Sequence, residues 1–153
     1  MEMKRNCQRH LWLLTGTGEG PIFASSLLER GWKVTISVVS ERAAIPYKNF
    51  PLEAVLVGDL GGTNSIRRVL ENAILKHNGF ALVIDATHPF ATLITSSLEK
   101  VCRDFSQPFL RYERPVEKIS DAVSLQSLNE LANYDLKGES MLIALGSKHL
   151  KEA

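Results

Sequence analysis

A glycine-rich stretch is the part of this sequence best suited to chemistry; its residues are Gly16, Thr17, Gly18, Glu19 and Gly20. Glycine lets the backbone approach a phosphate closely, and the N–H groups at the start of a helix point at such an anion. The common dinucleotide fingerprint has its third glycine one position later, where this chain has Pro21. We predict that these five residues bind the phosphates of a nucleotide cofactor; a turn that only joins a strand to a helix is the alternative.

A second group of polar residues lies at the end of the β-branched run 33–39. NAD-binding proteins usually place an acidic residue here to bind the ribose diol. This chain instead has Ser37 and Ser40, followed by Glu41 and Arg42. Hydroxyl groups and a guanidinium suit a 2′-phosphate, so we predict that Ser37, Ser40 and Arg42 bind NADPH. The alternative for Glu41 and Arg42 is a solvated surface pair.

A third group, Asp85, Thr87 and His88, follows the apolar run 80–84. We expect Asp85 at a strand end beside the nicotinamide half of the cofactor, with Thr87 also contacting the cofactor. His88 is the only histidine at the expected edge of the cleft, so we predict Asp85 and His88 as catalytic residues. The alternative is that Thr87 or His88 caps a helix that begins at Pro89.

Alternating apolar runs and amphipathic stretches form the scaffold that positions these groups. Strands are predicted over 11–14, 33–39, 54–57, 80–84 and 108–112, and helices over 21–30, 65–77 and 89–105. Nearly continuous apolar strands are typical of a parallel sheet covered on both faces. Right-handed crossovers then give a Rossmann-like, doubly wound α/β sheet of order 3-2-1-4-5, which binds ligands at the carboxyl ends of its strands. In the last helix we expect Phe90 and Leu93 to point inward.

The character of the sequence changes after Pro115, where a polar, irregular stretch begins. We predict a leader at residues 1–10, an NADP-binding domain at 11–115, and the truncated start of a second α/β domain at 116–153. The last segment is expected to hold a linker helix over 124–134 and a strand over 141–145.

The bulk composition argues against several classes of function. The chain has 153 residues and a formal net charge of +1, which gives no basic excess for nucleic acid. No apolar stretch is long enough to span a membrane. Cys7, Cys102 and the histidines have no metal-ligand spacing. We therefore expect a cytoplasmic protein with reduced thiols and no metal, nucleic-acid or membrane partner.

Four segments together resemble the precorrin-6A reductase family, the NADPH-dependent reductases of cobalamin biosynthesis. They are residues 11–21, with Gly-Thr-Gly-Glu-Gly, 28–31, with Leu-Glu-Arg-Gly, 85–91, with Asp-Ala-Thr-His-Pro-Phe-Ala, and 110–115, with Leu-Arg-Tyr-Glu-Arg-Pro. The resemblance implies two Rossmann-like domains with NADPH and a tetrapyrrole in the cleft between them. It also implies direct hydride transfer to a ring double bond of precorrin-6A or its cobalt form, followed by protonation of the neighbouring carbon.

Such a substrate carries many carboxylates, so its site needs spaced cations. Arg111, Arg114 and Lys148, together with His88, are the predicted substrate-binding residues; surface charges beside a linker are the alternative. The competing functions are a stand-alone NADP-sensing module and a Rossmann reductase for another small substrate. We expect a monomer. We also expect residues 1–153 alone to bind NADPH with little reduction of precorrin-6A, because the second wall of the cleft is largely missing.

Overall fold

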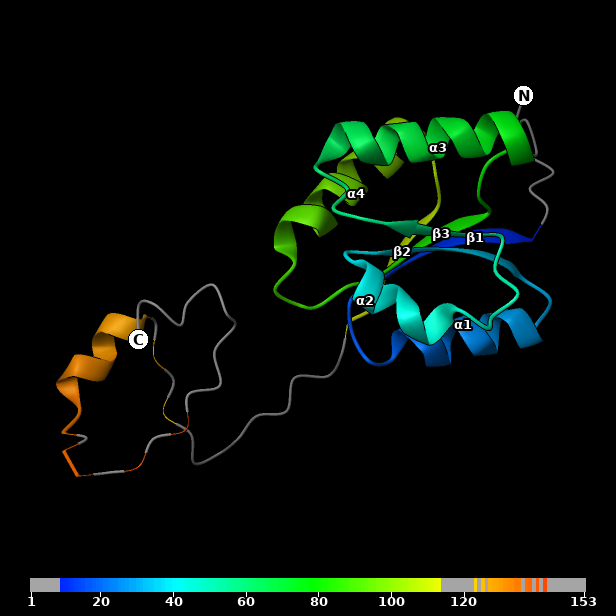
Figure 1. Cartoon of the computed structure of the whole chain (residues 1–153). Coiled ribbons are helices and arrows are strands. Elements are labelled where there is room, and N and C mark those ends of the chain that lie inside the picture. The colour runs from blue at the N-terminus through cyan, green and yellow to red at the C-terminus, as the bar shows by residue number, and fades with distance from the viewer. Residues whose placement is uncertain are drawn as a thin grey trace. The chain divides into compact units, whose positions relative to one another are not determined.

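The computed structural model describes residues 9–113 and, further along the chain, residues 123, 125, 127–135, 137, 138, 140 and 142. The chain divides into two units, Met1–Pro115 and Val116–Ala153. Figure 1 shows the α/β elements of the first unit and a short helical segment of the second. The site described below lies wholly within the first unit.

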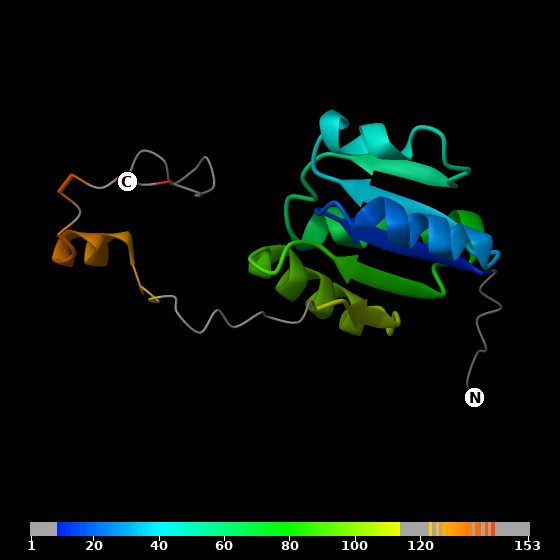
Figure 2. The same cartoon turned by 90° about the horizontal axis from the view of Figure 1, so that it is seen from below.

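The first unit is built on one five-stranded parallel sheet, whose strands are β1 His10–Thr15, β2 Lys33–Val38, β3 Ala54–Val57, β4 Leu82–Ala86 and β5 Phe109–Arg111. Their order is β3-β2-β1-β4-β5, as predicted. Figure 2 shows the strands side by side in a twisted sheet. The chain reverses its direction of travel across the sheet at β1, between β2 and β4. In this class of fold that reversal marks the ligand-binding end.

Helices cover both faces of the sheet; they are α1 Gly20–Glu29, α2 Glu41–Ala44, α3 Thr63–His77 and α4 Thr92–Asp104, with a 3-10 turn at Ile45–Tyr47. Figure 1 shows α3 and α4 on one face and α1 and α2 on the other. The alternation of side chains along β1 explains both layers. Trp12 packs in the cluster beneath α3 and α4, whereas Leu11 and Leu13 pack in the cluster beneath α1.

The end of β4 differs from the prediction. The strand was predicted over 80–84 but covers Leu82–Ala86, so Asp85 belongs to the sheet and lies at the strand end, as expected. Helix α4 begins only at Thr92, and Ala91 precedes it without a side-chain cap, so Thr87 and His88 do not cap this helix.

The inward placement of Phe90 and Leu93 was also wrong. Phe90 is 88% exposed and Leu93 is 84% exposed. Both side chains lie beside the start of α4, next to the loop that leaves the carboxyl end of β4. Two large apolar groups are therefore presented to solvent close to the candidate site.

The second unit contains a 3-10 helix at Leu128–Asn133, shorter than the predicted helix over 124–134. The predicted strand over 141–145 lies outside the described residues except for Leu142, which is exposed and not in a strand. The predicted second domain therefore stays a prediction. In the described part of the chain, no helix has both the length and the apolar character needed to cross a membrane.

The amino edge of the sheet holds a buried histidine, His10, which is 2% exposed. Its Nε2 lies 2.9 Å from the Thr35 hydroxyl, and its Nδ1 has no hydrogen-bond partner. Burial lowers the pKa of His10 from its usual 6.5; His77 and Lys33 lower it further, and Glu53 partly opposes them. The neutral ring is thus the form that the folded chain favours.

Candidate functional site

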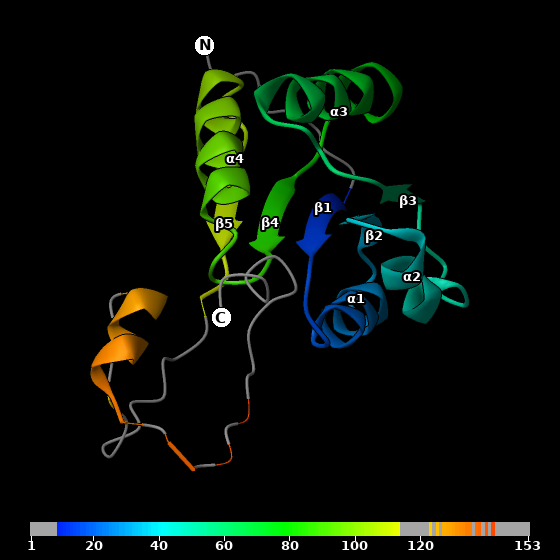
Figure 3. The same cartoon turned by 60° about the vertical axis from the view of Figure 1, so that its left-hand side comes forward.

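The carboxyl ends of the parallel strands meet at one edge, and a cavity of about 260 Å³ opens there. In Figure 3 the arrows of β1 and β4 point to this same edge. Its wall includes residues from the ends of three strands: Gly16 after β1, Val39 after β2 and His88 after β4. The remaining lining residues are Leu14, Thr15, Ser37, Val38, Gly58, Asp59, Leu60, Thr87, Ala91 and Ile94. Of the predicted site residues in the first unit, Gly16, Ser37, Thr87 and His88 line this cavity. The others, among them Gly18, Ser40 and Arg42, are not lining residues, and their roles stay predictions.

Gly20 is required by packing, because it begins α1 where that helix approaches the sheet. A Cβ on Gly20 would collide with the Tyr47 hydroxyl and lie 2.9 Å from Cβ of Thr15. The Tyr47 hydroxyl in turn donates to Thr15 Oγ1 at 3.0 Å, and burial raises the pKa of Tyr47. Tyr47 therefore supports the residue at which the glycine loop begins.

Gly18 has the opposite environment. A Cβ on Gly18 would have no other atom within 4 Å, and its φ lies outside the left-handed region. Folding alone does not demand a glycine at this position. The backbone is open to solvent, as required where a phosphate approaches a main chain closely.

The other residues of the glycine loop contact neighbouring parts of the chain. The Thr17 hydroxyl donates to Glu19 Oε2 at 3.4 Å, so a neighbouring side chain engages this carboxylate. Gly16 faces the loop after β4. A Cβ added to Gly16 would lie 3.5 Å from the backbone nitrogen of His88 and 3.7 Å from Thr87 Cα. The glycine loop and the Thr87–His88 turn are thus in van der Waals reach of each other.

The three residues predicted to contact the 2′-phosphate differ in accessibility. Ser37 is buried, and its hydroxyl accepts a hydrogen bond from the Trp12 indole at 2.8 Å. The Ser40 hydroxyl caps α2 by accepting from the Ala43 N–H at 3.3 Å. Arg42 is exposed on α2. Among the three, only Arg42 is exposed without a hydrogen bond assigned to its side chain, and its role stays a prediction.

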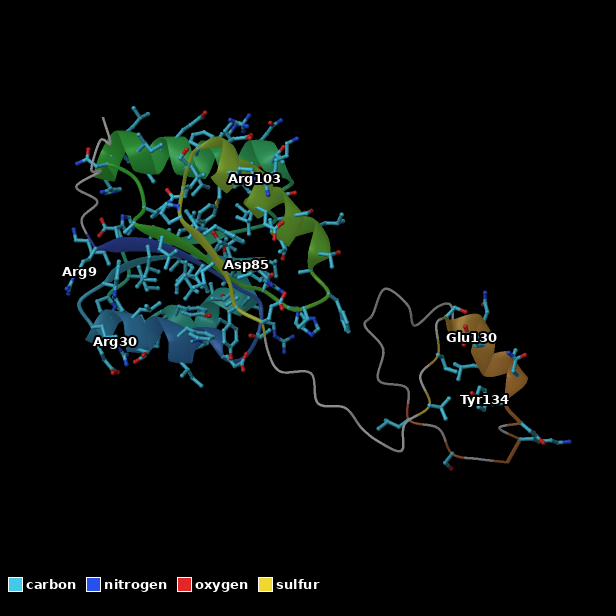
Figure 4. The ribbon with its side chains drawn as sticks, turned by 180° about the vertical axis from the view of Figure 1, so that it is seen from behind. Arg9, Arg30, Asp85, Arg103, Glu130 and Tyr134 are labelled. Carbon is cyan, nitrogen blue, oxygen red and sulfur yellow. The ribbon has the colours of Figure 1, made fainter. Side chains whose placement is uncertain are left out.

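Asp85 is the most tightly held polar residue of the site, with 0% of its surface exposed. Its Oδ1 accepts from the Thr87 N–H at 3.0 Å and from the Thr87 hydroxyl at 2.7 Å, and pairs with Arg111 at 2.8 Å. Its Oδ2 accepts from the Thr95 hydroxyl at 2.7 Å. Figure 4 labels Asp85 at the end of the sheet away from Arg9. This carboxylate joins β4, β5, α4 and the loop between β4 and α4.

Arg111 is turned into the molecule and has only 14% of its side chain exposed. Besides Asp85, its guanidinium donates to Thr87 Oγ1 at 2.9 Å and to the His88 carbonyl at 3.3 Å. The structure therefore gives the predicted substrate cation three acceptors within the chain. The other two predicted cations, Arg114 and Lys148, lie outside the described residues.

His88 is exposed at the cavity mouth, and its tautomer follows from one contact. The Phe90 N–H donates to His88 Nδ1 at 3.3 Å, so the proton of the neutral ring lies on Nε2. The two rings are near neighbours, with centroids 5.1 Å apart. His88 is thus a hydrogen-bond donor at the edge of the cavity, in front of an exposed aromatic ring.

Three residues that hold this edge together were missed by sequence reasoning: Tyr47, Trp12 in its polar role, and Thr95. Each acts through a hydrogen bond to a residue 10 or more positions away, and no local pattern signals such a partner. Among the described residues no cluster of histidines, cysteines and carboxylates could hold a metal ion. Cys102 is a free, buried thiol whose pKa burial raises to about 11.

The sheet order, the glycine loop and the cavity at the carboxyl edge define a Rossmann-like α/β protein. The family model described as precorrin-6x reductase CbiJ/CobK matches residues 10–153, so the chain belongs to this family. A cobalt-precorrin-6A reductase from Synechocystis is 27% identical over 146 residues, which cover 92% of this chain and 53% of the relative. A precorrin-6A reductase from Mycobacterium tuberculosis is 34% identical over 104 residues, which cover 67% of this chain and 38% of the relative.

A solved structure of CobK precorrin-6A reductase shares the fold, with a TM-score of 0.58 and 24% identity. The superposition covers 73% of this chain and 40% of that structure. The chain spans about half the length, or less, of the curated relatives it matches.

Proposed function

We propose that this chain forms the nucleotide-binding part of an NADPH-dependent reductase of cobalamin biosynthesis. The reaction would saturate a ring double bond of precorrin-6A or cobalt-precorrin-6A and give the dihydro 6B form. The observation that carries the proposal is the cavity between the glycine loop and the Thr87–His88 turn, in a chain matched by the family model over residues 10–153. The names of the curated relatives support the substrate class.

The residues present fit a dinucleotide. The backbone at Gly18 is open, so a pyrophosphate can approach it, and α1 begins directly behind the loop. Apolar side chains in the cavity wall, such as Val39 and Leu60, suit the flat face of an adenine. Arg42 is the exposed cation nearest in sequence to β2 on this edge and would pair with a 2′-phosphate.

NADPH, when bound, supplies the hydride. In the proposed reaction this hydride and a solvent proton would add across the double bond, so that the ring would gain two electrons and the cofactor would leave as NADP⁺. The task of the protein is to hold the two reactants within about 3–3.5 Å in a fixed orientation. The glycine loop would fix one reactant and the turn at His88 the other.

His88 would contact the substrate through Nε2–H. Because Nδ1 accepts the Phe90 N–H, the neutral ring donates only from Nε2, and protonation of Nδ1 would break that contact. We therefore assign His88 to hydrogen bonding with a substrate carboxylate or with charge that develops on the ring. Phe90 and Leu93, which are exposed next to it, would cover part of an apolar macrocycle face.

The second-domain segment at 116–153, the cations Arg114 and Lys148, a monomeric state and a cytoplasmic location belong to the same proposal. The two cations would neutralise substrate carboxylates.

Two experiments test the proposal. Titration of the chain with NADPH and NADH, followed by cofactor fluorescence, is expected to give saturable binding with preference for NADPH. A chimera in which residues 10–153 replace the matching segment of the Synechocystis relative is expected to oxidise NADPH only when precorrin-6A or its cobalt form is added. In that chimera His88→Phe is expected to raise KM for the tetrapyrrole and leave the Kd of NADPH unchanged. Absence of saturable NADPH binding would refute the proposal.

A further inference from the structure

The buried carboxylate of Asp85 collects donors from three parts of the fold. Arg111 comes from β5, Thr95 from α4, and Thr87 from the turn that follows β4. All donor–acceptor distances in this group lie between 2.7 and 3.0 Å. A buried carboxylate with this many donors is held in one place, because losing any of them would leave charge unsatisfied in the interior.

The same group fixes the turn that carries His88. Arg111 donates to the Thr87 hydroxyl and to the His88 carbonyl, so one guanidinium reaches both residues of the turn. On its other side the turn lies against Gly16, where an added Cβ would be 3.5 Å from the backbone nitrogen of His88. The turn is therefore enclosed between the Asp85 group and the glycine loop.

This arrangement argues against a direct chemical role for Asp85 and Arg111. A group that transfers a proton must reach the substrate within hydrogen-bond distance. Asp85 has none of its surface exposed, and Arg111 has 14% of its side chain exposed. Both side chains already have well-formed partners inside the chain.

We propose that Asp85, Thr95 and Arg111 are positioning residues, which hold the Thr87–His88 turn against the glycine loop and thereby set His88 relative to the bound nucleotide. The proposal rests on the proposed function for the role of His88 itself. Asp85, predicted from the sequence as a catalytic residue, and Arg111, predicted as a substrate-binding residue, thereby take a supporting role.

Two substitutions weaken the group without leaving Asp85 as an isolated charge. Arg111→Lys keeps a cation beside the carboxylate, but an ammonium lacks the planar fork that reaches Thr87 and His88 together. Thr95→Val removes one hydroxyl donor and keeps the branched shape. The matched controls are Arg103→Lys, an identical change at an exposed position near the end of α4 (Figure 4), and Thr95→Ser, which keeps the hydroxyl.

Three measurements on the whole chain decide the proposal. Thermal unfolding establishes that each variant is folded. Nitrogen NMR of the His88 ring at about pH 8 reports which ring nitrogen carries the proton, and cofactor fluorescence gives the Kd of NADPH. The NMR readout concerns the orientation of His88 and not global stability.

Wild type and both controls are expected to show the Nε2–H form of His88 and the same Kd. In folded Arg111→Lys and Thr95→Val we expect a mixture of His88 ring tautomers. We also expect a Kd of NADPH raised by about three- to tenfold, the range set by the loss of one hydrogen bond between the displaced Thr87 and the nucleotide. Wild-type ring signals and Kd in both variants would overturn the proposal. If wild type binds no NADPH, the proposed function fails, while the ring signals alone still decide the positioning role.

Discussion

Gly18 and Gly20 lie two residues apart in one loop, and the structure predicts opposite consequences for their substitution. An added Cβ at Gly18 enters open space, whereas at Gly20 it enters the space of Tyr47 and Thr15. Neither glycine has a left-handed φ, so backbone strain does not distinguish them. The comparison of Gly18→Val with Gly20→Ala thus separates a requirement of binding from a requirement of folding.

The magnitudes follow from these contacts. Adding a methyl group to a well-packed interior typically costs about 1–3 kcal/mol, and the 2.9 Å approach to Thr15 Cβ places Gly20→Ala in that range. A substitution that touches nothing changes stability by about 0.5 kcal/mol or less. For Gly18→Val we therefore expect the free energy of unfolding of wild type, together with loss of NADPH binding, because the side chain occupies the phosphate position.

Urea unfolding and NADPH titration of the same samples provide the two readouts. Removal of the colliding hydroxyl in Gly20→Ala/Tyr47→Phe should recover part of the lost stability relative to the two single changes, which a double-mutant cycle measures. The contact with Thr15 remains, so full recovery is not expected. The reasoning is refuted if Gly18→Val unfolds as readily as Gly20→Ala, or if it binds NADPH with wild-type affinity.

Further predictions concern single residues and the chain as a whole. The unfolded chain protonates His10 near its usual pKa and the folded chain only at lower pH, so the free energy of unfolding should fall as pH drops below about 6.5; urea titrations should show a weaker fall in His10→Gln. Arg42→Ala should lower the affinity for NADPH and leave that for NADH unchanged; a charge-assisted contact contributes roughly 1.5–3 kcal/mol. Cys102 should resist a thiol reagent in folded protein at pH 8 and react in urea, because it is buried with a pKa of about 11. Residues 1–153 should bind NADPH but show little turnover of precorrin-6A in an absorbance assay; turnover at a rate typical of enzymes would show that these residues suffice.

The strand order could be predicted because its determinants are local. Each strand is an apolar run that ends in glycine or polar residues, and each connection is long enough for the helical crossover that a parallel pair requires. The bounds of β4 could not be predicted in the same way. Asp85 interrupts the apolar run and suggests a loop, but Arg111, 26 positions later, allows the carboxylate to stay within the sheet.

The candidate site likewise combines residues that local sequence predicts with contacts that depend on distant residues. Gly16 and His88 were predicted from residue type and position, and both line the cavity at the carboxyl edge of the sheet. Gly18 is exposed in the same loop as Gly16, and its role stays a prediction. Ser37 is predicted to bind the 2′-phosphate, but its hydroxyl is buried and accepts a hydrogen bond from Trp12 of the neighbouring strand. Only the register of β1 against β2 reveals that contact, and one strand read alone does not contain it.

The glycine loop and the Thr87–His88 turn are each held in place by a residue from elsewhere in the chain. Tyr47 supports the glycine loop through Thr15, and Arg111 supports the His88 turn through Asp85. Tyr47 lies in the segment after β2, 32 positions from Thr15, and Arg111 lies in β5, 26 positions from Asp85. Since Gly20 is fixed by Tyr47 and not by a phosphate, the spacing of the glycines reflects packing at one position and ligand access at another. A departure from the common fingerprint at position 21 therefore does not weaken the prediction for Gly18, whose environment depends on neither support.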